Sequence, residues 1–301
     1  MAAAQQKPKR RHHHVWQQYL KPWTANGVIW CLQNDRIFST GTSVIAIEKD
    51  FYKLHNITQA DIELINMLFA KGHHLSRKNH AHLLSVLMKP FHIAAQGTCS
   101  QDRTNINKYL DDYSSNVLED YHASIEASFI PLLGSALKGD IRFYEDDEQC
   151  ILFLNYLCTQ YMRTKGIKER AIYLCKADGS ADLSRVWNVM IHMFAADIGA
   201  SLFVERKRRK LILIHNDCTE VPFLTGDQPA INLKAVQLGP PDRLAIYYPI
   251  SPQLALLLSD VDEEPLFATD GLTATQASTL NRKLFDACYK QVFAKSRESL
   301  L

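Results

Sequence analysis

The sequence predicts a mainly helical α+β domain with a small antiparallel sheet. Apolar residues recur at steps of three and four through most of residues 58–200, which is the helical period. Two β-rich segments, 28–47 and 209–258, flank this helical middle, and neither is large enough to be stable alone. We therefore expect the N-terminal hairpin and the C-terminal β block to pair in one sheet, so that residues 12–301 form a single domain.

Composition excludes several classes of protein. The 301 residues are 47% hydrophobic and 22% charged, with a net charge of +2, which is typical of a globular chain with an ample core. The seven cysteines are scattered and never form a C-x-x-C pair, which argues against a disulfide framework or a zinc ribbon and favours a reducing cytoplasm. No segment reads as a membrane span or a secretory signal, so we expect a cytoplasmic protein with no membrane partner.

The N-terminal segment is expected to begin as a flexible tail. Residues 1–11 are rich in Lys and Arg and read as a flexible basic tail, and residues 12–23 are dense in aromatic side chains. The runs 28–32 and 37–47 are β-rich and flank the polar break Gln33–Arg36, which predicts a β-hairpin.

Helices are expected from Thr58 onwards. Thr58 is a candidate N-cap for a helix that ends near Gly72, and Ser76 is a candidate N-cap for a second helix that stops before Pro90. The other expected helices lie at 104–137, 146–163, 183–200 and 273–295.

The segment Phe223–Pro229 is a polar turn between two β-rich runs. An Asp227 side chain at the top of such a turn would be held by a rigid sheet and would face outward, as a catalytic carboxylate requires. The same residues are also good turn formers without any chemistry, because Gly226 accepts positive φ and Asp bonds its own backbone. Both interpretations stay open from the sequence.

Two helical constellations could carry chemistry. Glu119, His122 and Glu126 share one helix face, but a di-iron site needs a second such motif and the sequence has none, so a solvated face is the alternative. Gln160 and Arg163 lie one turn apart, and an Arg there could grip a carboxylate or phosphate or could simply complement the helix dipole.

A compact basic cluster is the candidate nucleic-acid contact. It consists of Arg206, Lys207, Arg208, Arg209 and Lys210. It could meet a phosphate backbone, although such a cluster is also typical of a solvated hairpin tip. The sequence has no glycine-rich phosphate loop, no G-x-S-x-G and no H-E-x-x-H, which leaves hydride-transfer, P-loop and serine-hydrolase chemistry without support.

Several segments, in this order, resemble a bacterial family known only as domain of unknown function four-two-three-eight. His12–Trp23 is similar to the family's opening His-His-Tyr-Val-Pro-x-x-Tyr-Leu-x-x-Phe, although His14 and Trp16 replace the usual Tyr and Pro. The other similar segments are Glu48–Tyr52, Gln160–Thr164, Phe223–Pro229, Tyr248–Pro252 and Leu280–Asn281. In the family's Phe-x-Thr-Ser-Asp-Asn-Pro, this chain has Gly226 for Ser and Gln228 for Asn, so a role for that serine hydroxyl would not transfer.

The resemblance selects the candidate catalytic residues, which are His12, His13, Glu126, Gln160, Arg163 and Asp227. These are residue types that phosphoryl and phosphodiester sites use. We therefore hypothesise a cleft in which the histidine pair and Asp227 face Gln160 and Arg163. Such a site would cleave nucleic acid or a nucleotide, and a divalent metal is a candidate cofactor. A bacterial toxin or anti-phage effector would fit this activity.

Two alternatives remain. The same residues could form a buried structural network in a protein that works as a non-enzymatic partner in a larger complex. The chain could also bind nucleic acid through its basic clusters without cleaving it.

Overall fold

The computed structural model describes residues 7–96, 103–177, 179, 181–235, 243–262 and 271–301. The fold is mainly helical α+β, as the sequence predicts. The helices are α1 Gln17–Leu20, α2 Gln59–Leu68, α3 His74–Gln96, α4 Arg103–Ala136, α5 Asp147–Met162, α6 Lys165–Ala177, α7 Trp187–Val204 and α8 Ala274–Ala287. The strands are β1 Arg11–His13, β2 Ile29–Gln33, β3 Arg36–Thr40, β4 Ile47–Lys49, β5 Arg209–His215, β6 Thr225–Gly226, β7 Ile231–Asn232, β8 Ala245–Pro249, β9 Leu254–Asp260 and β10 Gln291–Ala294.

The predicted hairpin is confirmed and its turn follows from local chemistry. Strands β2 and β3 pair antiparallel, with Gln33 opposite Arg36. The two residues between them, Asn34 and Asp35, both have positive φ (50° and 59°), which Asn and Asp tolerate better than other non-glycine residues. The turn therefore fixes the register of the hairpin.

The N-terminal hairpin shares an antiparallel sheet with β6 of the C-terminal β block, through β10, whereas the other strands of that block form a second sheet. One sheet has the order β3-β2-β10-β6 and the other β5-β9-β8-β7, while β1 and β4 form a third, two-stranded sheet. The strand that joins the hairpin to β6 is β10, which lies within the range for which the sequence predicted a helix. Helix α8 ends at Ala287 because the next residues donate their backbone N–H groups to Asp227 and then enter the sheet.

Gly226 allows the close pairing of β6 with β10. A Cβ atom at this position would lie 2.6 Å from the backbone oxygen of Gln291, and the Cys288 sulfur lies closer still. Any side chain here would force the two strands apart. The packing therefore explains why this chain has glycine at this position.

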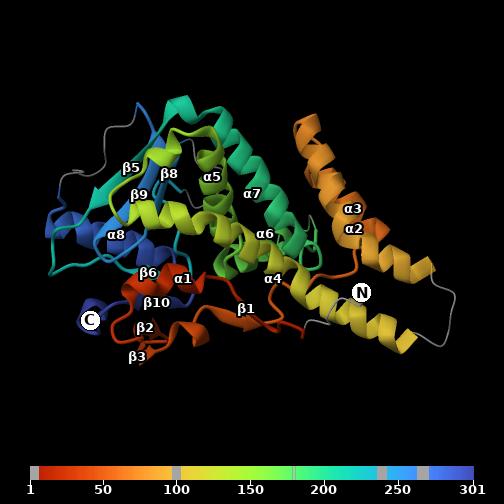
Figure 1. Cartoon of the computed structure of the whole chain (residues 1–301), viewed down its shortest axis with the longest axis horizontal. Helices are drawn as coiled ribbons and strands as arrows, with labels where there is room; N and C mark the ends of the chain where they lie inside the picture. Colours follow the sequence, from red (N-terminus) through yellow and green to blue (C-terminus); the bar gives the residue numbers. More distant parts are fainter. Residues whose placement is uncertain (1–6, 97–102, 178, 180, 236–242, 263–270) are drawn as a thin grey trace.

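The β5-β9-β8-β7 sheet separates two apolar cores. Successive residues of β8 point to opposite faces, so Ile246 and Tyr248 join the larger core whereas Tyr247 joins the smaller one. Helices α5 and α7 contribute to the larger core and α8 to the smaller one. Figure 1 shows α8 beside the strands, away from α7. Burial on both faces explains the nearly continuous apolar sequence of these strands.

Several helix boundaries differ from the expectation. The capping box of Thr58 with Asp61 starts α2 as predicted. Helix α3, however, begins before Ser76 and continues through Pro90 to Gln96, because an internal proline can kink a helix without ending it. Helix α6 was not expected, since the predicted helices 146–163 and 183–200 leave its residues unassigned, and Gly166 lies within its first turn.

The basic tail ends earlier than predicted. Lys9 donates its backbone N–H to the Asn116 side chain at 2.6 Å, and Arg10 forms an ion pair with Asp50 at 2.6 Å. Arg11 already belongs to β1. Residues 9–11 are therefore held against the domain, and residues 1–6 lie outside the described part of the chain.

Helix α7 is long and apolar enough, by length and composition, to pass as a membrane span, which the sequence interpretation had not expected. Its 18 residues have a mean hydropathy of 1.3, and 56% of them are buried within the molecule. Packing against α5 accounts for this composition, because a helix buried on most sides is apolar on most sides.

Candidate functional site

Arg163 is the centre of a buried polar cluster. It follows the last turn of α5, and its side chain is only 2% exposed. Its Nη2 atom donates to Glu126 Oε1 at 2.5 Å and to Gln160 Oε1 at 3.0 Å. The structure therefore brings together three of the candidate residues, one from α4 and two from the end of α5.

Burial and the attraction between the two charges shift the pKa values of Glu126 and Arg163 in opposite directions. Burial raises the pKa of Glu126, and the positive charge of Arg163 opposes that rise. For Arg163, burial favours the neutral form, but attraction to Glu126 and nearby tyrosines outweighs it and raises the pKa. Arg163 is therefore a permanent cation within the core.

Glu119 lies two turns before Glu126 on the same face of α4. Burial raises its pKa to about 7, with Arg163 opposing and Glu126 reinforcing the rise. One carboxylate oxygen, Oε2, has no hydrogen-bond partner among the described residues, while the carboxyl group has a backbone hydrogen bond with His13. Glu119 can thus hold or release a proton near neutral pH.

The charge of Arg163 affects the pKa values of three buried histidines. His14, His122 and His192 are all buried, and neither ring nitrogen of any of them has a hydrogen-bond partner in the described part of the chain. Burial and then the charge of Arg163 lower the pKa of His14 and of His192 to about 3, and they also lower that of His122. All three rings are therefore neutral near pH 7.

The rings of this cluster pack closely. The ring centroid of His122 lies 5.0 Å from that of His192 and 4.3 Å from that of Tyr52. The Tyr52 hydroxyl donates to the backbone oxygen of Arg163 at 2.8 Å. Buried polar atoms without partners are rare in native proteins, and they commonly mark a functional site or ordered water. No three His, Cys, Asp or Glu side chains in the described ranges are arranged to hold a metal ion.

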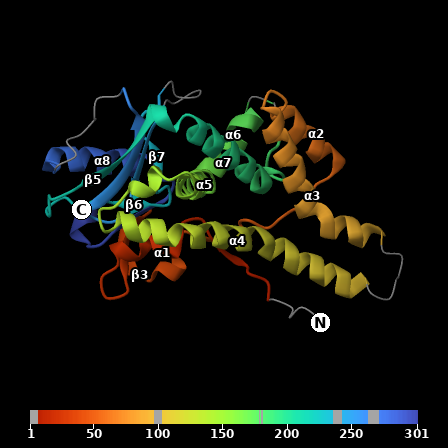
Figure 2. The same cartoon turned by 45° about the horizontal axis from the view of Figure 1, so that its top comes forward.

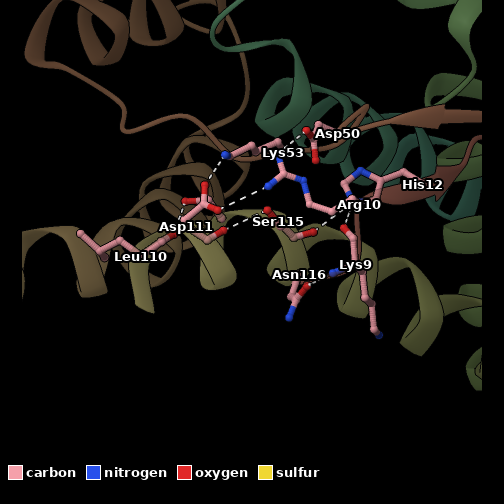
Figure 3. A network of polar contacts seen from close by, with 10 residues as sticks. Lys9, Arg10, His12, Asp50, Lys53, Leu110, Asp111, Ser115 and Asn116 are labelled. Atoms are coloured by element: carbon pink, nitrogen blue, oxygen red, sulfur yellow. Dashed lines mark hydrogen bonds and ion pairs between the residues drawn. The ribbon is translucent and has the colours of Figure 1, made fainter. Parts of the chain in front are cut away.

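The ring nitrogens of His12 are hydrogen-bonded to backbone groups. Its Nε2 atom lies 2.6 Å from the Lys9 oxygen and 3.0 Å from the Ser115 oxygen (Figure 3). Its Nδ1 atom accepts the Tyr52 N–H at 2.8 Å. Both nitrogens are therefore satisfied in the neutral tautomer that carries its proton on Nε2. Burial lowers the pKa of His12, which favours that neutral form. The ring fixes β1 to α4.

His13 lies at the edge of the cluster. It is half-buried, and its Nε2 atom lies 3.0 Å from the side-chain nitrogen of Gln17. Burial lowers its pKa, and Arg163 contributes to that shift. With Glu119, it forms the partly exposed side of the Arg163 cluster.

Asp227 makes its contacts elsewhere. Its carboxylate accepts the backbone N–H groups of Tyr289 and Lys290 at 2.8 Å and of Gln291 at 3.0 Å. No contact joins it to Arg163, Glu126 or Gln160 in the described ranges, so the geometry differs from the single cleft that we hypothesised. The connection is indirect, because Gln228 accepts the hydroxyl of Thr164, the residue after Arg163.

The basic cluster is largely neutralised by acidic neighbours. Arg206 forms an ion pair with Asp147, and Arg209 forms ion pairs with Glu205 at 2.9 Å and with Asp260. Lys210 donates to the Val261 oxygen at 3.2 Å. Lys207 and Arg208 are exposed. The five residues thus present two exposed cations rather than a continuous basic surface.

A separate apolar pocket of about 300 Å³ lies between α5 and α7. Its lining includes Ile151, Asn155, Ala195, Gly199 and Phe203. None of the Arg163 cluster residues lines it. Its apolar character offers little to a charged substrate.

The sequence interpretation did not carry forward four residues of the cluster. Glu119 and His122 were visible as the first part of the Glu-x-x-His pattern that shares a face with Glu126. His14 stands next to the candidate pair, but nothing in the sequence indicated that its ring is buried. His192 comes from α7, and no local pattern could have placed it beside His122.

No curated protein and no solved structure shows significant similarity to this chain. A family model matches residues 11–298, nearly the whole chain, and its description is Protein of unknown function (DUF4238). The match includes every residue of the Arg163 cluster. The chain therefore belongs to the DUF4238 family.

Proposed function

We propose that this chain is a hydrolase that cleaves a phosphoryl or phosphodiester bond in a nucleotide or nucleic acid, with Glu119 as its general acid or base. The feature that carries the proposal is the placement of Glu119 and Glu126 on one face of α4, with the buried guanidinium of Arg163 bonded to Glu126 and with burial raising the pKa of Glu119 to about 7. A group that titrates near the working pH is the most effective proton-transfer catalyst.

The roles follow from the residue types. Glu119 accepts the proton of an attacking water, the oxygen bonds to phosphorus, and the bond to the leaving oxygen breaks as that oxygen takes a proton from solvent. Arg163 stabilises the charge on the phosphoryl oxygens, since its Nε atom has no partner among the described residues. Gln160 and Glu126 hold the guanidinium in place. A substrate would reach this centre past His13 and Glu119, which are both half-buried.

The test is a hydrolysis assay with a matched control. Purified protein is incubated with RNA, DNA and nucleotides, with and without a divalent metal, and products are separated by electrophoresis or chromatography. We expect Glu119→Gln to lower the rate at least about a hundredfold and to remove the limb of the pH–rate profile near pH 7. Asp112→Asn makes the same chemical change on the same helix and should leave the rate unchanged. Absence of product with every substrate, or equal rates for Glu119→Gln and the wild type, would refute the proposal.

A non-enzymatic role is the second candidate, and a specific observation favours it. Both ring nitrogens of His12 and both carboxylate oxygens of Asp227 are already hydrogen-bonded to backbone groups. The Arg163 side chain is almost inaccessible to solvent. In that case the cluster serves to fix β1 against α4 in a protein that acts by binding a partner. Loss of folding in Arg163→Lys, with no activity in the wild type, would favour this role. A toxin or anti-phage effector is a context that fits either one.

A further inference from the structure

The basic surface with no acidic partners lies on a two-helix projection, not on the Arg206–Lys210 cluster. This projection, which we call the basic arm, consists of residues 71–96 and 103–110. Figures 1 and 2 show the end of α3 and the beginning of α4 extending away from the sheets. The arm thus presents a surface at one end of the molecule.

The arm carries cations alone. Residues 71–96 and 103–110 include six Lys or Arg residues and no Asp or Glu. The six are Lys71, Arg77, Lys78, Lys89, Arg103 and Lys108, and each is exposed. None of them forms an ion pair with another residue that the structure describes. Their charge is therefore available to an external anion.

The cations of α3 belong to one polar stripe. His74, Lys78, His82, Ser85 and Lys89 follow one another at steps of four, four, three and four, so they share one face of the helix. All five are exposed. The opposite face, which includes Leu84, Leu87 and Met88, is buried in the larger core. The stripe is therefore held outward by the packing of the helix.

Two acidic groups on neighbouring elements, Asp111 and Asp197, are already engaged, whereas Asp112 on α4 forms no ion pair among the described residues. Asp111 on α4 forms ion pairs with Arg10 at 3.5 Å and with Lys53, as Figure 3 shows. Asp197 on α7 contacts His80 at 3.1 Å, on the buried side of α3. Neither reduces the charge of the outward stripe.

We propose that the basic arm is a nucleic-acid-binding surface that contacts the phosphate backbone. The chemistry is that of an unpaired row of ammonium and guanidinium groups, which gains free energy by releasing the counterions of a polyanion. Tyr109, at the start of α4, is 54% exposed and offers a ring on which an unpaired base can stack.

A polyanion fits the arm better than a lipid surface. A membrane-binding helix inserts a continuous apolar face, usually with Trp or Phe. On α3 that face is already packed in the core, and Phe91 packs against Tyr113. The exposed aliphatic residues Leu75, Val86 and Ile93 lie on one face at separations of 11 and 7 positions, which are about 16 and 10 Å along the helix, so they form no continuous patch.

The test is binding of the full-length protein to labelled RNA and to labelled DNA duplex of about 20 nucleotides or base pairs, followed by fluorescence anisotropy over a salt series. We expect Lys78→Gln/Lys89→Gln to weaken binding at least about tenfold at low salt. It should also reduce the slope of log K against log salt by about 2, which is one unit for each lost phosphate contact. Because binding is measured without turnover, its result is independent of the proposed hydrolysis.

The matched control is Lys207→Gln/Arg208→Gln, which removes two exposed cations of the Arg206–Lys210 cluster. We expect it to leave the affinity within about threefold of wild type, since those cations lie outside the arm. Both variants alter exposed side chains, and thermal melts are used to check that each is folded. Absence of binding to either nucleic acid, or equal weakening by the control, would overturn the proposal. Binding of the arm only to vesicles of phosphatidylserine and phosphatidylcholine would also overturn it.

Discussion

Arg163 Nη2 and Glu126 Oε1 lie 2.5 Å apart, where the end of α5 meets the middle of α4, and the two side chains are 2% and 16% exposed. The pair joins positions 37 residues apart in the chain. Isolated charges at this depth would be very costly, so each residue depends on the other. The ion pair therefore also links the packing of α5 to that of α4.

Removing both members of this pair should destabilise the protein less than the two single removals would add up to. We expect Arg163→Met to lower the free energy of unfolding by about 3–5 kcal/mol, because it leaves Glu126 buried without its partner. The double variant Arg163→Met/Glu126→Leu should lose less than the sum of the two single changes. Urea denaturation of the wild type and the three variants measures this, and strictly additive losses would contradict it.

The stability of the protein should depend on Glu119 at neutral pH. Its pKa rises from 4.5 to about 7 on folding, so the stability that it contributes is complete below about pH 4.5 and is lost as pH rises through 7. At about 1.4 kcal/mol per pH unit, the loss amounts to about 3 kcal/mol. Glu119→Gln cannot ionise, so its stability relative to wild type should increase by up to that amount between pH 5 and pH 8. Urea denaturation at both pH values is the measurement, and a constant difference between the two proteins would count against the burial of this carboxyl group.

The buried histidines should make the protein less stable as pH falls, whereas Glu119 makes it less stable as pH rises. The pKa of His192 falls from 6.5 to about 3 on folding, so its contribution is complete above pH 6.5 and is lost as pH falls towards 3. His192→Phe keeps an aromatic ring against Tyr121 and His122 but cannot take up a proton. We expect this variant to lose less stability than wild type between pH 6.5 and pH 4.5, as measured by thermal melts. An acid dependence equal to that of the wild type in His192→Phe would contradict this prediction.

Local chemistry made part of the fold predictable. The turn at Asn34 and Asp35 and the N-cap at Thr58 depend on residues close in sequence, and both are where the sequence placed them. Strand β10 follows α8 directly and forms only because β2 and β6 accept it from distant parts of the chain. No local pattern contains that information.

The sequence also predicted only some of the residues of the candidate site. The one-turn spacing of Gln160 and Arg163 and the resemblance to a family selected residues that the structure brings together with Glu126. His14 follows β1, His122 lies on α4 and His192 lies on α7, and the sequence gives no sign that Arg163 influences all three. Asp227 was chosen for an outward-facing carboxylate, whereas its oxygens face the backbone of residues 289–291.

Asp227 should therefore stabilise β10 rather than take part directly in hydrolysis. Asp227→Ala removes the acceptor for three backbone N–H groups and should lower the free energy of unfolding by about 3 kcal/mol or more, while Asp227→Asn, which keeps one carbonyl oxygen, should lose less. Amide hydrogen exchange at residues 289–294 should accelerate in Asp227→Ala before the rest of the chain is affected. Asp286→Ala breaks only an exposed ion pair with Arg282 and should change the stability by less than about 1 kcal/mol. If Asp227→Asn kept wild-type stability but lost hydrolysis in the assay described above, the carboxylate would have a chemical role and this structural assignment would fail.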